Sequence, residues 1–386
     1  MAACDVIVIG LGAMGAAAAD HLARRGARVL GIERFGIAHG RGSSHGRSRA
    51  IRLAYFEDPA YVPLLRRAYE NWRDLERRSG ESLLSITGTL EIGRPDGAVV
   101  AGSLASCRQH QLMHEMLDRA SIRRRCPVFE LPEDYVALWQ PDGGYLRPEA
   151  AVAASIGLAA EAGAQLHFGE QVRSIEPDAG AVTVVTDEAR YEAGQVIVAA
   201  GPWLADLVPE IAPHLRPTRQ VLGWFWPRDM AAFGPGRLPV FIVDDGADGA
   251  HYGFPAFEGS AVKVARHGHL DEPVGPDNAR RPVRPEDVAV LRRFLAARLP
   301  LLDGEPVQTA TCTYSRLPED FFLIDRAPSD PRILVASPCS GHGFKFASVI
   351  GEILADLAMA GATPLPVAPF SWAAMARRAS ADAGGD

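Results

Sequence analysis

The stretch DVIVIGLGAMG at residues 5–15 decides the fold predicted for this chain. Its first part, residues 5–9, is an unbroken apolar run, which is typical of a buried strand in a parallel sheet. The alanine-rich residues 16–25 indicate a helix that ends at Gly26. Residues 29–33 form a second apolar strand, so the segment predicts a complete strand–helix–strand unit.

The glycine turn inside this unit predicts a binding site for a dinucleotide pyrophosphate. The first glycine makes the tight bend, the second lets backbone approach the pyrophosphate, and the third allows close packing of helix on strand. The start of the helix adds oriented N–H groups and partial positive charge. Glu33, at the end of the second strand, would accept from a ribose hydroxyl, and it leaves FAD and NAD as alternatives. The predicted cofactor contacts here are Gly10, Gly12, Ala13, Met14, Gly15 and Glu33.

Length and composition place the unit in a larger protein. The chain has 386 residues, too many for one simple core, and 47% of them are hydrophobic, as in globular proteins. A net charge of −7 favours neither nucleic acid nor a membrane surface as a partner, and no apolar run reaches the roughly 20 residues that cross a bilayer. We expect no signal peptide, because a basic region and cleavage site are missing. Five scattered cysteines without metal-ligand spacing suggest reduced thiols in a cytoplasm.

The rest of the chain predicts an α/β fold, in which a Rossmann-type FAD-binding domain is interleaved with a substrate domain rich in mixed β-sheet. Amphipathic patterns indicate helices at residues 61–78, 147–162, 285–299 and 346–359. The cofactor domain is expected to comprise residues 1–85, 141–215 and 310–375. The substrate domain is expected to comprise residues 86–140 and 216–309, and a flexible tail residues 376–386.

Two features of the middle of the chain favour FAD over NAD. Gly201 follows the apolar strand at 196–200 and resembles the second glycine turn with which FAD-binding oxidoreductases return to the dinucleotide. Val172 occurs where such proteins lay a backbone strand against adenine. Each feature is weak alone.

Three further motifs make the resemblance specific. They are SSHGRSRAIR at 43–52, CTY at 312–314 and SGHGFK at 340–345. Together with the glycine turn, and in this order, they resemble the monomeric sarcosine oxidase and N-methyltryptophan oxidase family of flavin-dependent amine oxidases. The resemblance extends from residue 5 to about residue 360.

The resemblance implies how the cofactor is held. Cys312 matches the cysteine that forms a thioether to the flavin 8α carbon, and a thiolate is a suitable nucleophile where neighbouring cations stabilise it. Without the motif, a buried structural cysteine would be the ordinary interpretation. The other implied cofactor contacts are Ser43, Ser44, Arg49, Gly341, Gly343, Phe344 and Lys345.

The resemblance also implies a substrate pocket. Arg52 and Lys345 match a pair that clamps the substrate carboxylate, and two cations on one buried carboxylate would offset its loss of water. Tyr252 and Tyr314 match aromatic residues over the flavin face. Val243 stands where the family has a larger methionine, so we expect the pocket to admit a bulkier substrate than sarcosine.

Four residues match catalytic positions of the family. Lys263 matches the lysine that activates oxygen, although alone in an apolar alternation it would more often be a solvated strand edge. Arg49 matches a basic residue near the flavin ring, and His45 and His267 match histidines near flavin and substrate. For both histidines a structural role stays an equal alternative.

The sequence therefore predicts a cytoplasmic, monomeric oxidase. It would oxidise N-methyl or other secondary α-amino acids with FAD, yielding an imine that water hydrolyses, and would reduce oxygen to hydrogen peroxide. One alternative is a dehydrogenase that passes electrons to a quinone or carrier protein. A second is an FAD-binding module without activity, which the joint presence of Cys312, Lys263 and Lys345 disfavours.

Overall fold

The strand–helix–strand unit predicted at the start of the chain is the centre of the first of two large sheets. In the computed structural model, which describes residues 4–278 and 282–382, it comprises β1 (Cys4–Ile9), α1 (Ala13–Ala23) and β2 (Val29–Glu33). Strands β1 and β2 are parallel, with Val6 opposite Val29. The unbroken apolar run of β1 follows from this central position, since its residues are buried from Val6 onwards on both faces.

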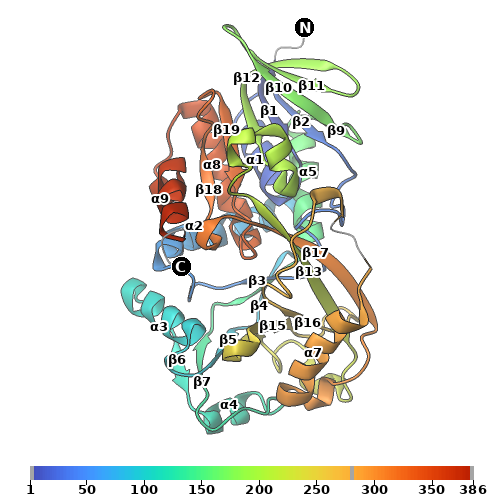
Figure 1. The fold of residues 1–386 in the computed structure, drawn as a ribbon, viewed down its shortest axis with the longest axis vertical. Helices are drawn as coiled ribbons and strands as arrows, with labels where there is room; N and C mark the ends of the chain where they lie inside the picture. The colour runs from blue at the N-terminus through green and yellow to red at the C-terminus, as the bar shows by residue number, and fades with distance from the viewer. Residues whose placement is uncertain (1–3, 279–281, 383–386) are drawn as a thin grey trace.

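The first sheet has eight strands in the order β10-β11-β12-β1-β2-β9, with β19 paired to β12 and β18 to β19. The strands not yet given are β9 (Gln165–Phe168), β10 (Val172–Pro177), β11 (Val182–Thr186), β12 (Arg190–Val198), β18 (Leu323–Arg326) and β19 (Ile333–Ser337). Helices α1, α2 (Val62–Ser79), α5 (Pro148–Glu161) and α8 (Ala347–Ala360) pack together against it, in the upper half of Figure 1. Short α6 (Leu204–Leu207) follows β12.

The second sheet also has eight strands and forms the lower half of the molecule (Figure 1). Its order is β17-β13-β16-β15-β14-β5-β7-β6. The strands are β5 (Thr89–Gly93), β6 (Glu115–Leu117), β7 (Val136–Gln140), β13 (Arg216–Phe225), β14 (Val240–Asp244), β15 (Ala250–Phe254), β16 (Val262–Arg266) and β17 (Gln308–Arg316). Helices α3 (Ala98–His110), α4 (Arg119–Arg125) and α7 (Pro285–Arg298) belong to this half. A small third sheet of β3 (Arg49–Ile51), β8 (Gly144–Leu146) and β4 (Leu84–Ile86) lies between the two halves.

Two expectations about the chain's organisation need correction. Strand β17, at residues 308–316, pairs with β13 in the second sheet, so the strand that carries Cys312 is not part of the cofactor sheet to which residues 310–375 were assigned. The predicted flexible tail at 376–386 is also wrong over its first part, because helix α9 (Trp372–Asp382) continues through it. Buried Met375 anchors that helix to the core; residues 383–386 lie outside the described part.

None of the helices in the described ranges is both long and apolar enough to span a membrane.

Candidate active site

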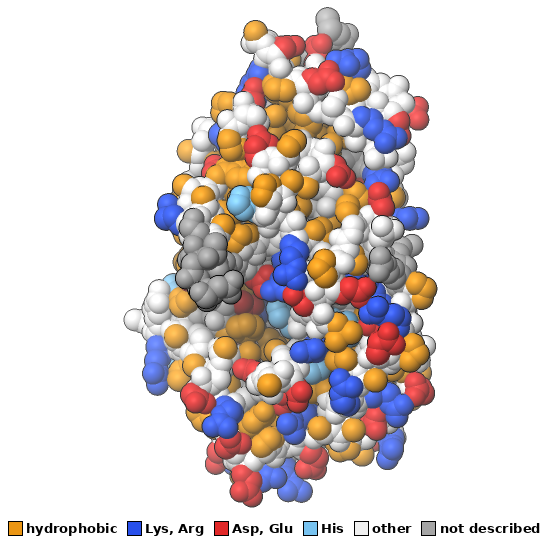
Figure 2. Space-filling model, viewed as in Figure 1, with side chains coloured by type: hydrophobic (Ala, Val, Ile, Leu, Met, Phe, Trp, Pro, Cys, Tyr) orange, Lys and Arg blue, Asp and Glu red, His pale blue; other side chains and the backbone are white. Residues whose placement is uncertain are grey.

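One large cavity runs between the two big sheets. It begins at the glycine turn before α1 and ends near Lys345, and its empty volume, counting space open to solvent, is about 2030 Å³. Its lining includes residues of the glycine turn, of β17 and of the SGHGFK motif, so one continuous cavity joins these segments. Figure 2 shows the surface hollowed near the middle of this face.

The glycine turn has the shape that a pyrophosphate requires. Gly10 has a φ of +85°, and a Cβ there would lie 2.7 Å from the carbonyl oxygen of Ala199. A Cβ on Gly15 would lie 1.8 Å from the oxygen of Gly10, so the third glycine is needed for packing and does not face the cavity. A Cβ on Gly12 would approach nothing closer than 3.7 Å, which leaves the second glycine open to a ligand. Gly12, the N-cap residue of α1, has no side chain of its own to cap the helix.

Glu33 is buried at the end of β2 and lines the cavity. Its Oε2 accepts from the backbone N–H of Leu11 (2.8 Å) and its Oε1 from that of Phe35 (2.9 Å). These bonds fix the carboxylate beside the glycine turn, where a ribose hydroxyl would reach it. Val172 and Gly201 also line this end of the cavity, as expected for the adenosine side of a dinucleotide.

The segment at residues 43–52 crosses from the cofactor sheet to β17 and brings Arg49 to Cys312. Ser43 donates through Oγ to the carbonyl of Thr313 (2.6 Å), while Ser44 Oγ accepts from the N–H of Ala13 (3.2 Å). Arg49 Nη2 lies 3.5 Å from Cys312 Sγ and 2.9 Å from the carbonyl oxygen of Ser43. The sulfur of Cys312 therefore has a guanidinium beside it.

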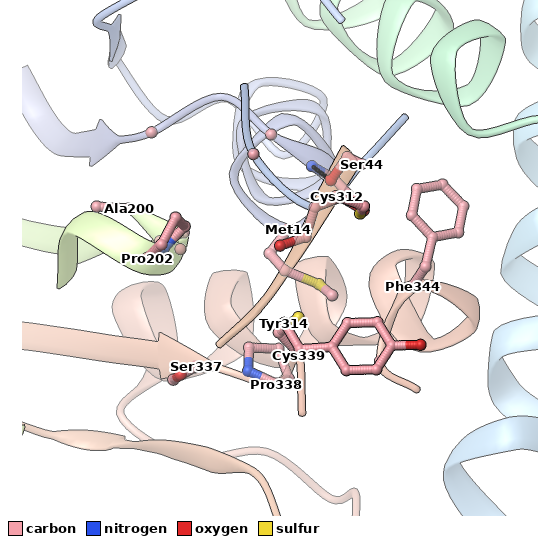
Figure 3. Close-up of a pocket in the computed structure, with 18 of the residues that line it drawn as sticks. Met14, Ser44, Ala200, Pro202, Cys312, Tyr314, Ser337, Pro338, Cys339 and Phe344 are labelled. Carbon is pink, nitrogen blue, oxygen red and sulfur yellow. Dashed lines mark hydrogen bonds between the residues drawn. The ribbon is translucent and has the colours of Figure 1, made fainter. Parts of the chain in front are cut away.

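Figure 3 shows Met14, Cys312, Tyr314 and Phe344 around the same open space, with Ala200 and Pro202 on its far side. Cys339 also lines this cavity.

Tyr252, Tyr314 and His267 form an aromatic wall in the substrate half of the cavity. Burial raises the pKa of both tyrosines and lowers the pKa of His267, so all three are uncharged near neutral pH. Gly341 has a φ of +79°, and a Cβ there would lie 2.6 Å from the ring of Tyr314. The glycine of the SGHGFK motif is thus what lets Tyr314 approach the backbone.

Arg52 lines the cavity and is engaged by two carboxylates that sequence reasoning missed. Arg52 Nη2 donates to Glu57 (2.8 Å), and its Nε lies 2.8 Å from Glu91 Oε1. Burial raises the pKa of Glu91 to about 7 despite Arg52. For Glu57, burial acts in the same direction but the nearby cations outweigh it, and the pKa falls to about 2. Glu91 was visible in the sequence as a carboxylate inside the apolar strand TLEIG.

Lys345 lies at the same end of the cavity as Arg52. Its Nζ donates to the carbonyl of His342 (2.5 Å) and lies 3.5 Å from the hydroxyl of Tyr55. Burial, and then the charge of Arg52, lowers the pKa of Lys345 to about 7. The net positive charge expected from Arg52 and Lys345 at this end of the cavity is therefore smaller than two. Glu57 is ionised, and Glu91 and Lys345 both titrate near neutral pH.

Lys263 lies one layer behind the cavity wall. Its Nζ donates to the carbonyl oxygens of Gly46 (2.9 Å) and Ser48 (2.5 Å) and lies 4.1 Å from the ring centre of Phe254, which does line the cavity. Burial, and then Arg49, holds the pKa of Lys263 well below its usual value. It is not the solvated strand edge that its sequence context alone would suggest.

Besides Gly15 and Lys263, two further predicted residues do not line the cavity. Val243 lies in the core of the second half, and its neighbour Ile242 lines the cavity instead. Because side chains alternate along a strand, an error of one residue exchanges the two faces. His45 is buried near the site but is not part of the cavity wall. The expectation of a wider pocket at Val243 is therefore wrong.

A signal that could have singled out both site lysines lies in the composition. Lysine and arginine together number 40, yet Lys263 and Lys345 are the only two lysines in the sequence. Both are buried. A guanidinium keeps its charge almost anywhere, whereas a buried ammonium titrates readily, so the two positions stand apart from the chain's other basic residues.

The fold and the glycine turn define a dinucleotide-binding protein in which a second large sheet lines the same cavity. The comparison with family models makes this specific: the model for FAD dependent oxidoreductases matches residues 5–357, and the chain belongs to that family.

Within the family, known amine oxidases are similar over almost their whole length. The monomeric sarcosine oxidase of Streptomyces avermitilis is 45% identical, with 95% of this chain and 96% of that protein covered. The N-methyl-L-tryptophan oxidase of Salmonella dublin is 36% identical, with 95% and 97% covered. The solved structure of NikD, an amino acid oxidase of nikkomycin biosynthesis, has a TM-score of 0.84 at 28% identity, with 96% and 98% covered. The expected resemblance is confirmed.

Proposed function

We propose that this protein is an FAD-dependent oxidase of N-methylated or other secondary α-amino acids that releases hydrogen peroxide. One observation carries the proposal: a single cavity joins the dinucleotide turn at Gly10–Gly15 and Cys312 to a pocket with two tyrosines and two buried cations. The names of the similar proteins, which act on sarcosine, N-methyl-L-tryptophan and an amino acid, support the same substrate class.

The chain's residues would bind and orient the substrate. Arg52 and Lys345 hold its carboxylate, and the uncharged faces of Tyr252 and Tyr314 contact the amine and its substituent. FAD, when bound, accepts two electrons and a proton from the carbon next to nitrogen and passes the electrons to oxygen. Lys263, whose Nζ donates to two backbone carbonyls, would in its ammonium form stabilise negative charge that develops on oxygen.

We further propose that the flavin is attached through Cys312 and that the enzyme is a cytoplasmic monomer. The proximity of Arg49 to Cys312 Sγ supports attachment. The name of the similar monomeric sarcosine oxidase supports the oligomeric state. The scattered cysteines form no disulfide in the described residues, which is compatible with a reducing compartment.

A substrate panel tests the proposed activity. Peroxide release and oxygen consumption are measured with sarcosine, N-methyltryptophan, pipecolate and proline, and with the decarboxylated amine of whichever is most active. We expect turnover of an amino acid and little turnover of its amine. Lys345→Ala should raise the KM of the acid by at least about tenfold, since it removes one of two charge-assisted bonds, and should leave the amine unaffected.

Two outcomes would contradict the proposal. Equal turnover of acid and amine by the unaltered protein would refute the carboxylate clamp. Reduction of an artificial quinone without oxygen consumption would favour the dehydrogenase alternative.

A further inference from the structure

The ring of Tyr55 contacts both cations of the proposed carboxylate clamp. The Cζ atom of Arg52 is 4.7 Å from the centre of its ring, and the Nζ atom of Lys345 is 5.1 Å from the same centre. Tyr55 is completely buried and does not line the cavity, so it would act on the substrate only through these neighbours. A ring that contacts both cations fixes the distance between them.

The hydroxyl of Tyr55 belongs to a hydrogen-bonded chain with one direction. His342 Nε2 lies 2.8 Å from the carbonyl oxygen of Asp320, which can only accept, so Nε2 carries the hydrogen. Nδ1 of the neutral ring must then accept, and it lies 2.5 Å from the hydroxyl of Tyr55. Tyr55 therefore donates to His342 and presents its lone pairs toward Lys345, whose Nζ is 3.5 Å away.

We propose that Tyr55, oriented by His342, is a positioning residue that holds Arg52 and Lys345 at the spacing of a carboxylate and favours the ammonium form of Lys345. The inference rests on the proposed function, because it explains how the clamp is built. It adds a residue that touches neither substrate nor cofactor.

The electrostatic surroundings of Lys345 make its protonation sensitive to a single hydrogen-bond acceptor. The pKa of Lys345 is about 7, so a small change in its bonding alters the fraction of ammonium near neutral pH. The titratable and charged groups that act on Lys345 or on His342 are Arg52, Glu57, Glu91, Tyr55 and His267. Burial lowers the pKa of His342 to about 4, which keeps its ring neutral and its direction of bonding fixed.

Tyr61 provides a matched control. Its ring packs 5.1 Å from that of Tyr55 and 5.5 Å from His342, in the same buried aromatic cluster. Its hydroxyl is buried but has no hydrogen-bond partner in the described structure. Tyr61→Phe therefore removes the same atom as Tyr55→Phe without touching the chain to Lys345.

Because the sequence has only two lysines, the titration of Lys345 can be measured directly. Protein labelled with ¹³Cε-lysine gives signals from Lys263 and Lys345 alone, and Lys263→Met assigns them. In the flavin-loaded protein, we expect Tyr55→Phe to lower the titration midpoint of Lys345 by about one pH unit, because the ammonium loses an acceptor that the amine needs less. The dissociation constant of pyrrole-2-carboxylate at pH 7 should rise about 5- to 10-fold, while that of uncharged pyrrole stays constant. Tyr61→Phe should change neither quantity.

An unchanged midpoint and affinity in Tyr55→Phe would overturn the inference, as would equal weakening of pyrrole and pyrrole-2-carboxylate. If Tyr55→Phe does not fold, His342→Leu replaces it. In this variant the tyrosine hydroxyl loses its acceptor and can turn its hydrogen toward Lys345, so the titration midpoint of Lys345 should again fall. An unchanged midpoint would overturn the inference. Failure of the proposed function would look different. The unaltered protein would then fail to prefer the carboxylate, whatever the lysine signals do.

Discussion

At the scale of single residues, the site depends on which basic side chain stands at each position. Arg49 and Arg52 supply charge that burial cannot remove, whereas Lys263 and Lys345 have lowered pKa values and can lose a proton. Substitution of lysine by arginine would therefore not be conservative here. Burial raises the pKa of Cys107 and of Cys126 to about 12. Cys312 differs from both in having the guanidinium of Arg49 beside its sulfur.

Cys312 is predicted to carry the flavin. The intact protein should be heavier than its chain by one FAD, and acid precipitation should leave the yellow colour in the pellet. Cys312→Ser should release the flavin into the supernatant, because a serine hydroxyl does not supply a thiolate nucleophile. Cys107→Ser is the control, since Cys107 is buried in the core and does not line the cavity. Release of all the flavin from unaltered protein would refute attachment.

Lys263 is predicted to act on oxygen and not on the substrate. Lys263→Met should slow reoxidation of the reduced enzyme by about 10²–10³-fold, the effect of losing one well-placed electrostatic group. Reduction by substrate should change far less. Stopped-flow absorbance separates the two half-reactions, and Lys345→Met, which removes the other lysine, should show the opposite pattern. Equal slowing of both half-reactions by Lys263→Met would identify a structural residue.

At the scale of elements, strand register decides which side chains reach the cavity. Ile242 on β14 lies opposite Tyr252 on β15 and opposite Glu91 on β5, so the three share one face of the second sheet. Val243, one position further, belongs to the other face and to the core. The same alternation that places Ile242 in the pocket places Glu91 under Arg52.

A buried ion pair ties β13 to α7 within this half of the molecule. Arg219 donates to both oxygens of Asp287, at 3.1 and 2.8 Å, and His269 Nε2 lies 3.0 Å from Oδ1. Asp287→Asn should lower the free energy of unfolding by about 3–5 kcal/mol, because it leaves the buried Arg219 with only the more distant Glu272, at 3.6 Å, as a counter-charge. Denaturant unfolding measures the loss, and Glu176→Gln, in the exposed pair with Arg190, should have no measurable effect.

The same pair predicts a pH dependence. Burial alone would raise the pKa of Asp287, but hydrogen bonds from Arg219 and its neighbours outweigh burial and lower it. A lowered carboxyl pKa contributes stability above the unfolded value near 3.9, which is lost as the pH falls through the folded value. The difference in stability between unaltered protein and Asp287→Asn should therefore be constant from pH 6 to 8 and shrink below about pH 4. A difference that grows at acid pH would contradict this assignment.

At the scale of the whole molecule, the cavity lies between the two large sheets and is lined by residues from both halves. Cofactor contacts come from the glycine turn before α1 in one half, and Cys312 and Tyr314 come from β17 in the other. The segment at 43–52 links them through Ser43 and Thr313. A ligand in this position would contact both halves, and its binding would oppose their separation.

Bound FAD is therefore predicted to stabilise the whole fold. Flavin-free Cys312→Ser protein should unfold at a lower temperature than the same protein with FAD. Added FAD at about 100 times its dissociation constant should stabilise it by about 2.7 kcal/mol, seen as a single, concentration-dependent rise in the unfolding temperature. AMP, which can occupy only the adenosine end near Glu33, should give a smaller shift. A rise confined to one of two transitions would mean that the halves unfold independently.

The sequence by itself determined the features that depend on local order. The glycine turn, Glu33 and the SGHGFK motif could be placed because each acts within a few residues of the chain, where spacing fixes geometry. The helices at 62–79, 148–161, 285–298 and 347–360 were predictable for the same reason.

Only the tertiary structure decided what lies next to what across long separations. Glu57 and Glu91 became partners of Arg52, and Tyr55 a neighbour of Lys345, because strands and loops from distant segments meet at the cavity. Ile242 lines the cavity where the sequence predicted Val243, because the alternating pattern of a strand cannot be assigned to a face of the sheet until the strand register is known. Burial then set the pKa values of these side chains, and the loss of water that causes those shifts appears only when the chain is folded.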